Sequence, residues 1–204
     1  MGTAATDLEA EKALVERAKT DAEAFGELYD QYYDKIFGYI VHRMGNVEVA
    51  QDVTSETFFK ALKSLHSFEW RSISFSSWLF RIATNEMTNH YRKNKHYTSA
   101  DIDDLAEHPS NQEDVREEIM QAEDELQRNQ DYVLMRAAVE KLPDKYQEVI
   151  TLRFFEEKQI LEIAEIVGKK EGTVKSLLSR GVEKLRVCME NMDTMQPSGN
   201  NSVI

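Results

Sequence analysis

Apolar residues recur along most of the chain at spacings of three and four, which is typical of helices with one buried face. The clearest example runs from Phe25 to Met44, where apolar and aromatic residues keep to one side and the tyrosines are expected to pack in or beside a core. The same pattern predicts helices over residues 8–19, 25–44, 47–65, 76–95, 132–142 and 145–155, with two more between residues 160 and 186. We therefore predict an all-α protein.

Local breaks in the pattern indicate where these helices begin and end. Gly45-Asn46 supplies a turn, and Pro143 is expected at the first position of a helix, where its missing N–H costs nothing. Residues 67–77 show no helical period and are predicted to form a loop, with Ser76 or Ser77 as the N-cap of the next helix.

The end of the chain predicts a helix-turn-helix. A short helix with one apolar stripe ends at Gly168, a residue free to adopt the positive φ of a helix C-cap, and a second helix follows. The inner residues are expected to be Ile160, Ile163, Ala164 and Val167 in the first helix, and Val174, Leu178, Val182 and Leu185 in the second.

The outer face of this second helix has the chemistry of a DNA contact. Hydroxyls, cations and the free N–H groups of a helix start suit phosphate oxygens, and side chains just beyond them can reach base edges in a major groove. Basic residues on an exposed helix are often only solvated, yet residues 169–186 hold six Lys or Arg against two acids in a chain of net charge −12. The predicted contacts are Thr173, Lys175, Ser176 and Arg180, with Lys169 and Lys170 in the turn before them.

The helix over residues 47–65 has two distinct faces. Its core side is expected to consist of Phe58, Ala61, Leu62 and Leu65. The opposite side places Asp52 and Glu56 one turn apart beside Phe59. An acidic and aromatic patch of this kind suits docking on a basic partner helix, although a solvated face with Phe59 partly buried is the alternative.

The helix over residues 76–95 has a polar stripe suited to unpaired bases. Its buried side is expected to hold Leu79, Ile82, Ala83 and Met87. A ring can stack on a base, amides can bind a base edge, and cations can hold phosphates. Of the four rings Phe68, Trp70, Phe75 and Trp78, two are expected in the core. The opposite stripe comprises Trp78, Arg81, Asn85, Thr88 and Arg92, flanked by Asn89 and followed by Lys93 and Lys95.

Charge is distributed unevenly along the chain. Residues 98–131 contain twelve Asp or Glu against two Arg, a balance of −10, so the remainder of the 204 residues carries −12 − (−10) = −2. High charge and few aromatics favour a solvated linker there, with a mimic of nucleic acid in a basic channel as the alternative. We predict two helical domains, 1–97 and 132–190, joined by the acidic linker 98–131 and followed by a disordered tail, 191–204.

Other classes of function find little support. The chain has no apolar run long enough for a membrane span and no signal-peptide pattern, and its single Cys188 fits a reducing cytoplasm. No paired His or Cys spacing, glycine-rich phosphate loop or Ser/His/Asp arrangement is present, so we expect no enzyme, no cofactor and no metal.

Three segments together resemble one family. AQDVTSETFFKAL (50–62), SFSSWLFRIATNEMTNHYRKNK (74–95) and the stretch from Leu142 to Arg186 are similar, in order and spacing, to bacterial sigma factors of the extracytoplasmic-function class, which keep only sigma domains 2 and 4. The resemblance implies a factor that binds core RNA polymerase and directs it to promoters. It implies polymerase contacts through Asp52, Glu56 and Phe59 on the clamp helices of one large subunit, with a further contact to the flap of the other.

By the same resemblance, domain 2 captures flipped −10 bases while domain 4 docks on −35 DNA. Contacts with −10 DNA fall to Trp78, Arg81, Asn85, Asn89, Arg92 and Lys93, and contacts with −35 DNA to Thr173, Lys175, Ser176 and Arg180. The linker would occupy the RNA-exit path of the polymerase, and control by an anti-sigma partner is common in the family. The chain departs from the family at Ser55 (commonly Gln), Asn89 (often Asp) and Leu177 (commonly Arg), which puts one −35 contact and the −10 preference in question.

Two other interpretations stay open at this stage. A stand-alone helix-turn-helix regulator would bind duplex DNA without polymerase and would give Trp78 and Asp52 no role. An adaptor that binds proteins through both modules would touch no DNA and would tolerate loss of Arg180.

Overall fold

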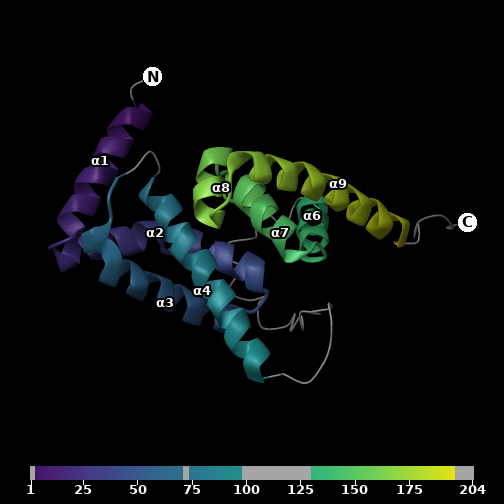
Figure 1. Cartoon of the computed structure of the whole chain (residues 1–204), viewed down its shortest axis with the longest axis horizontal. Helices are drawn as coiled ribbons and strands as arrows, with labels where there is room; N and C mark the ends of the chain where they lie inside the picture. The colour runs from purple at the N-terminus through teal and green to yellow at the C-terminus, as the bar shows by residue number, and fades with distance from the viewer. Residues whose placement is uncertain (1–2, 71–73, 98–129, 196–204) are drawn as a thin grey trace, which may run out of the picture.

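The computed structural model describes residues 3–70, 74–97 and 130–195, which form helices joined by short turns, with no strand in these ranges (Figure 1). The all-α prediction is confirmed. Residues 98–129 of the predicted linker lie outside the described residues, and its last two residues, 130 and 131, begin a helix. The prediction of a disordered tail from residue 191 is wrong for residues 191–195, which form the end of the last helix, Glu171–Met195; residues 196–204 lie outside the described residues. The helices are α1 Thr3–Ala18, α2 Ala22–Met44, α3 Val47–Ser64, α4 Phe75–Tyr97, α6 Gln130–Glu140, α7 Asp144–Ile150, α8 Ile160–Val167 and α9 Glu171–Met195; a 3₁₀ turn, Leu65–Ser67, follows α3, and a π-helical turn, Thr151–Phe155, follows α7.

Helices α1 to α4 form the first module around the inner side of α2. Leu28, Ile36 and Ile40 are almost fully buried there, as the 3.6-residue period predicts. The hydroxyl of Tyr39 lies 3.0 Å from that of Thr84 in α4, so the buried phenol has a hydrogen-bond partner. Tyr39 and Tyr32 are buried and Tyr29 lies at the rim, which confirms these tyrosines as packing residues.

Polar caps set the ends of α2 and α3. The Asp21 carboxylate accepts a hydrogen bond from the N–H of Glu23, which satisfies one free donor at the start of α2. Gly45 ends α2 in the left-handed region, with φ of 63°, and the Asn46 side chain accepts from the N–H of Val49 at 2.9 Å to begin α3. The predicted turn at Gly45-Asn46 is thus confirmed.

Two predicted caps are wrong. Helix α4 begins at Phe75, and the hydroxyl that accepts from the N–H of Ser77, at 3.3 Å, belongs to Ser74. Ser76 and Ser77 lie inside the helix and are buried. Pro143 immediately precedes α7 instead of occupying its first position. For α4 the wrong serine was predicted as the cap, and for α7 the proline was identified but the helix begins one residue later.

Two residues expected on inner faces are exposed. Leu62 is 49% exposed and stands with Phe59 on the outer side of α3, and Val182 is 44% exposed on α9. On α9 the buried position is the neighbouring Gly181, where an added Cβ would lie 3.1 Å from Cγ1 of Ile150. The close approach of α9 to α7 turns that side of the helix inward, and Val182 consequently faces out.

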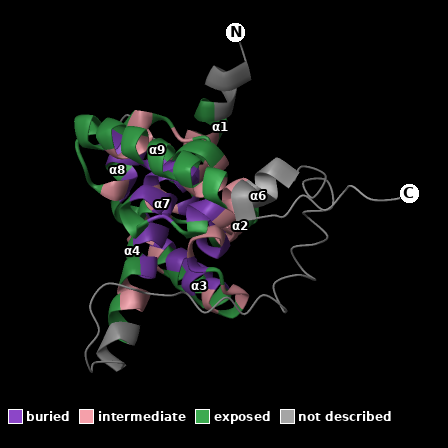
Figure 2. Ribbon diagram, turned by 90° about the vertical axis from the view of Figure 1, so that its right-hand side faces the viewer, coloured by how far each residue is buried: buried purple, intermediate pink, exposed green. Residues whose placement is uncertain are grey.

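The two modules share one hydrophobic core. Ile163 of α8 and Leu152 of the π-helical turn are buried in the same cluster as Leu79 and Phe80 of α4. Figure 1 shows α8 beside the first turns of α4, with α9 running across the second module. A smaller cluster holds α6, α7 and α9 together through Tyr146 and its apolar neighbours. Figure 2 shows this burial gathered where α4 and α7 meet their neighbours, while α9 is largely exposed.

Polar contacts rim the junction between the modules. The Glu162 carboxylate of α8 accepts hydrogen bonds from the hydroxyls of Ser77, at 2.9 Å, and Ser74, at 3.2 Å. Lys158 donates to the hydroxyl of Ser76, and its ammonium lies 4.7 Å from the centre of the Phe80 ring. The start of α4 is therefore both buried and hydrogen-bonded by the second module.

Burial at this junction perturbs two titrating groups. Loss of solvent raises the pKa of Glu156 to about 7, against the opposing charges of Lys158 and Lys35. Loss of solvent lowers the pKa of His42 to about 4, and the nearby Arg136 lowers it further. The junction therefore favours a neutral form of both side chains.

We predict that Glu156→Gln stabilises the protein at alkaline pH. Because the pKa of Glu156 in the folded protein, about 7, lies above its ordinary value of 4.5, its stabilising contribution is present below pH 4.5 and is lost as the pH rises through 7. The variant should gain in urea-unfolding free energy over the wild type at about pH 8, and the gain should shrink toward about pH 5. Glu157→Gln, the same change at an exposed neighbour, should leave the wild-type profile intact; an equal gain at all pH values would contradict the prediction.

Two glycine substitutions should have opposite effects on stability. Gly168 adopts φ of +64°, so Gly168→Ala is expected to cost about 1 kcal/mol of unfolding free energy. Gly26 lies within α2 with open space at its Cβ position, so Gly26→Ala should add about 0.5–1 kcal/mol. Urea titration of both variants measures the change in unfolding free energy. A loss of stability in Gly26→Ala would contradict the prediction, because it would mean that the added methyl group clashes with its neighbours.

Candidate nucleic-acid interface

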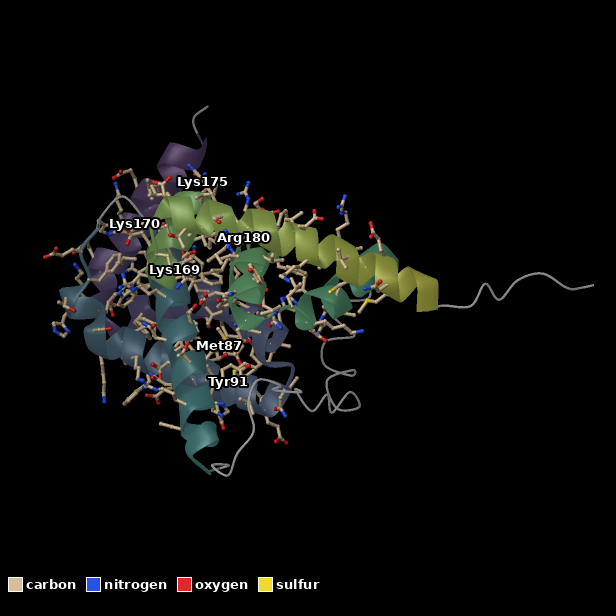
Figure 3. The ribbon with its side chains drawn as sticks, turned by 45° about the vertical axis from the view of Figure 1, so that its right-hand side comes forward. Met87, Tyr91, Lys169, Lys170, Lys175 and Arg180 are labelled. Atoms are coloured by element: carbon tan, nitrogen blue, oxygen red, sulfur yellow. The ribbon has the colours of Figure 1, made fainter. Side chains whose placement is uncertain are left out.

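The helix-turn-helix places a basic, hydroxyl-rich surface on the outside of α9. Val174 and Ile163 are fully buried, which fixes α9 against α8, and Gly168 makes the turn between them with φ of 64°. This arrangement leaves Thr173, Lys175, Ser176 and Arg180 exposed, with Lys169 and Lys170 exposed in the turn. Figure 3 shows the two turn lysines at the α8–α9 corner and Lys175 and Arg180 further along α9. The side chains predicted for duplex DNA are therefore together on one helix and its turn.

Two further contacts refine this basic surface. The Lys175 ammonium lies 3.8 Å from the Glu171 carboxylate, and both side chains are more than half exposed, so the pair can separate at little cost. Leu177, where the resembling family commonly has Arg, is half-buried and packs against both apolar clusters. Leu177 therefore serves helix packing in this chain.

On α4, the predicted polar stripe is largely exposed. Arg81, Asn85, Thr88, Arg92 and Lys93 all lie open to solvent. Asn89 is half-buried, because its side chain is engaged on both sides: the amide nitrogen donates to Glu86 at 3.2 Å and the amide oxygen accepts from Arg92 at 2.8 Å. Within the stripe, Asn89 and Arg92 are thus held by hydrogen bonds, and Arg81, Asn85 and Lys93 are exposed.

The four rings near the start of α4 divide as expected. Phe68 and Phe75 are buried, and Trp70 and Trp78 are half-buried, which confirms that two of the four belong to the core. The ring centroids of Trp78 lie 5.0 Å from Phe68 and 5.3 Å from Phe75, so the indole is held in place by both. Trp78 is therefore held in place at the start of the stripe.

A hollow of about 380 Å³ lies between α3 and α4. Helix α4 contributes Ile82, Asn85 and Glu86, and α3 contributes Lys60, Lys63 and Ser64. One wall is thus apolar, and amide, hydroxyl, ammonium and carboxylate groups surround it. The hollow is shallow and open to solvent, so its shape alone does not indicate a small-ligand site.

Sequence reasoning missed Glu86, which is only 8% exposed. Its carboxylate accepts a hydrogen bond from the Lys60 ammonium at 2.6 Å, and this bond raises the pKa of Lys60. A signal was available, because Glu86 falls seven residues after Leu79 and three after Ala83, on the side of α4 that otherwise holds apolar residues.

The outer side of α3 has the mixed character predicted for a protein partner. Asp52, Glu56 and Phe59 are exposed, with Phe59 at 49%. The ammonium of Lys63 lies 4.0 Å from the centre of the Phe59 ring, and Leu62 adds a second exposed apolar side chain. Half of the Phe59 side chain is therefore exposed and half is covered, so both the docking surface and the solvated face stay open as interpretations.

The described ranges hold neither a membrane-spanning helix nor a cluster of metal ligands. None of the helices there has the length and apolar character needed to cross a bilayer. No group of three or more His, Cys, Asp or Glu side chains in residues 3–70, 74–97 and 130–195 could hold a metal ion.

The two modules match two family models. Residues 28–97 match the model described as Sigma-70 region 2, and residues 132–185 match Sigma-70, region 4. The first match contains most of α2 and all of α3 and α4. The second match contains α8 and the first part of α9, which together form the helix-turn-helix. Each surface described above therefore lies in a matched region.

Curated relatives agree with these models. The chain is 35% identical over 173 residues to the ECF RNA polymerase sigma factor BldN of Streptomyces coelicolor, covering 84% of this chain but only 63% of that relative's length. It is 34% identical over 177 residues to the ECF RNA polymerase sigma factor SigW of Bacillus subtilis, covering 86% of this chain and 94% of the relative.

A solved structure supports the fold. CnrH, in complex with the cytosolic domain of CnrY, matches with a TM-score of 0.64 over 89% of this chain and 98% of that chain, at 22% identity. Taken with the two family models and with relatives above 30% identity, the fold leads to one assignment. This chain belongs to the extracytoplasmic-function class of the sigma-70 family of RNA polymerase sigma factors.

Proposed function

We propose that this chain binds core RNA polymerase and directs it to promoters by contacting −35 DNA through α9 and −10 DNA through α4. The observation behind the proposal is that one chain combines both sigma regions with two exposed DNA-type surfaces, although its net charge is −12. Such acidity opposes phosphate binding by the free chain, so the proposal assigns part of the DNA affinity to the polymerase.

In the −35 contact, the N-terminal half of α9 enters the major groove. Thr173 and Ser176 supply hydroxyls, and Lys169, Lys170 and Lys175 supply charge for phosphates. Arg180 has the reach and the paired donors needed for a guanine edge. Because Leu177 packs inward, base recognition falls to fewer side chains than the family commonly uses.

In the −10 contact, the hollow between α3 and α4 receives one unpaired base. Ile82 supplies an apolar wall, Asn85 can bind a base edge, and Trp78 stands beside the path of the strand. Arg81 and Lys93 are exposed along α4 and can hold phosphates, and Arg92, which donates one hydrogen bond to Asn89, has further donors for the same role. The energy of unstacking a base, a few kcal/mol, would be offset by these contacts.

Asp52, Glu56 and Phe59 form the proposed docking surface for the polymerase clamp helices, with a second contact from the other module to the flap. The exposed ring provides contact area, and the two carboxylates orient a basic partner helix. In the solved structure of CnrH, that protein is bound to the cytosolic domain of CnrY. We therefore extend the proposal to a regulatory protein partner for this chain. The chain would act by binding, not catalysis, and in the cytoplasm, where the polymerase works.

Loss of Asp52 and Glu56 should weaken binding to core polymerase. We expect Asp52→Ala/Glu56→Ala to lower core affinity about tenfold or more, because two carboxylates leave the centre of the docking surface. The control is Asp30→Ala/Asp34→Ala, an exposed acidic pair with the same spacing on α2, which makes the same charge change elsewhere. Core pull-down and run-off transcription on a promoter library measure the effect; no binding of core by the wild type would favour a stand-alone regulator.

Arg180→Ala should reduce −35 recognition selectively. An arginine bound to a guanine edge is worth about 1–3 kcal/mol, so transcription from promoters with the preferred −35 sequence should fall about tenfold. Polymerase binding should persist. Arg186→Ala, which removes an exposed arginine further along α9, should have little effect. Equal losses in the two variants would mean that only overall charge matters.

A further inference from the structure

The junction between the two modules joins bodies that each have packing of their own. In the second module, α6, α7 and α9 share a separate apolar cluster around Tyr146. In the first, α2 packs against α3 and α4. The shared cluster connects the two modules chiefly through α8, whose Ile163 and Ile166 are buried in it beside Leu79 and Phe80 of α4. Separating the modules would therefore expose this shared part and leave each module its own contacts.

The edges of the junction are polar. At one edge the Glu162 carboxylate accepts from the hydroxyls of Ser77 and Ser74, at 2.9 and 3.2 Å. At the other, Nη1 of Arg43 in α2 donates to Oε1 of Gln147 in α7 at 2.7 Å. Each of these groups can form equivalent hydrogen bonds with water, so these bonds oppose opening only weakly.

Two buried polar atoms of α2 disfavour the closed junction. Nδ1 of His42 and Nε of Arg43 have no hydrogen-bond partner within the part of the chain that the structure describes. The ring centroids of His42 and Phe155 lie 5.3 Å apart, and Arg43 contacts Gln147, so the second module covers both residues. A buried donor or acceptor without a partner is costly, and opening would return both atoms to water. Apolar burial thus closes the junction against an opposing polar term.

The closed packing also fixes the two DNA-type surfaces relative to each other. Helix α9 packs on α8, and α8 packs on α4, so the outer face of α9 and the polar stripe of α4 belong to one body (Figure 1). While this packing lasts, neither module can orient independently on its own promoter element.

We propose that the contact of α8 with the start of α4 is autoinhibitory: it holds the free chain closed, and core polymerase opens it by binding the two modules at separate places. This inference rests on the proposed function, which gives each module its own contact on the polymerase. Since only the open form is competent, the closed form lowers the apparent affinity of the chain for core.

A matched pair of substitutions at Ser74 tests the contact. Ser74 is the N-cap of α4, because its hydroxyl accepts from the N–H of Ser77, and Asp and Asn are equally good N-caps. Ser74→Asp would place a second carboxylate against Glu162 and should open the junction by repulsion. Ser74→Asn has nearly the same shape, has no charge and can donate to Glu162, so it should stay closed.

Energy transfer between dyes on the two modules measures the opening. The dyes would be attached at the exposed positions Asp30 on α2 and Glu190 on α9, after substitution of both by Cys in a Cys188→Ala background. The free wild type and Ser74→Asn should show one closed population, and Ser74→Asp should show lower transfer. Adding core should lower transfer in the wild type. Ser74→Asp should also reach half-maximal transcription at a concentration about threefold lower.

A cleavable cross-link tests whether opening is required. Ser74→Cys/Glu162→Cys, again with Cys188→Ala, would be joined by a bismaleimide that contains a disulfide. The joined protein should not initiate at promoters that need both elements, and reduction of the linker should restore initiation, which excludes misfolding as the cause. The control joins Glu183→Cys to Arg186→Cys, an exposed pair within α9, and should initiate before and after reduction.

The outcomes distinguish this inference from the proposed function. Equal initiation by the joined and the reduced protein, or low energy transfer in the free wild type, would overturn the autoinhibitory contact and leave the sigma activity standing. Failure of the wild type to bind core would instead defeat the proposed function, and with it the opening step that depends on core.

Discussion

The packing of α4 against three neighbours is the contact on which the rest of this structure depends. One side of α4 faces α2 and α3 in the first module, and its first turns are covered by α8 of the second. Phe75, Leu79 and Phe80 are each about 1% exposed as a result. Because α4 is held on these sides, its remaining side is left free and rigid, and that side bears the polar stripe.

Periodicity predicted most of the helices, since each has a wide apolar stripe and ends at a residue with a local reason to stop. Gly168 and Gly45 were identified because only glycine adopts positive φ at little cost. Periodicity defines a face but does not say what covers it. Leu62 and Val182 lie at the edges of their stripes, and only the position of neighbouring helices decided that both would be exposed.

For the candidate sites too, the sequence predicted which residues are exposed but did not predict their distant contacts. Exposed residues such as Asp52, Asn85 and Arg180 could be placed from sequence, because a polar residue opposite an apolar stripe faces outward. Contacts between distant segments could not. The pairing of Glu86 with Lys60 joins positions 26 residues apart, and that of Glu162 with Ser77 joins positions 85 apart. No local rule relates such positions, and a buried carboxylate contradicts ordinary patterning until its partner is known.

The shared core of the two modules has a consequence for how far the chain can reach along DNA. Packed helices lie about 8–10 Å apart, so α9, which packs on α8, lies only about 20 Å from α4. Elements centred at −35 and −10 are about 25 base pairs apart, or about 85 Å of duplex at ~3.4 Å per pair. Even the full length of α4, 23 residues or about 35 Å, does not close that gap. A chain that spans both elements at once must therefore separate α8 from α4, exposing Ser74, Ser76 and Ser77 to water and releasing Glu162 and Lys158 from their partners.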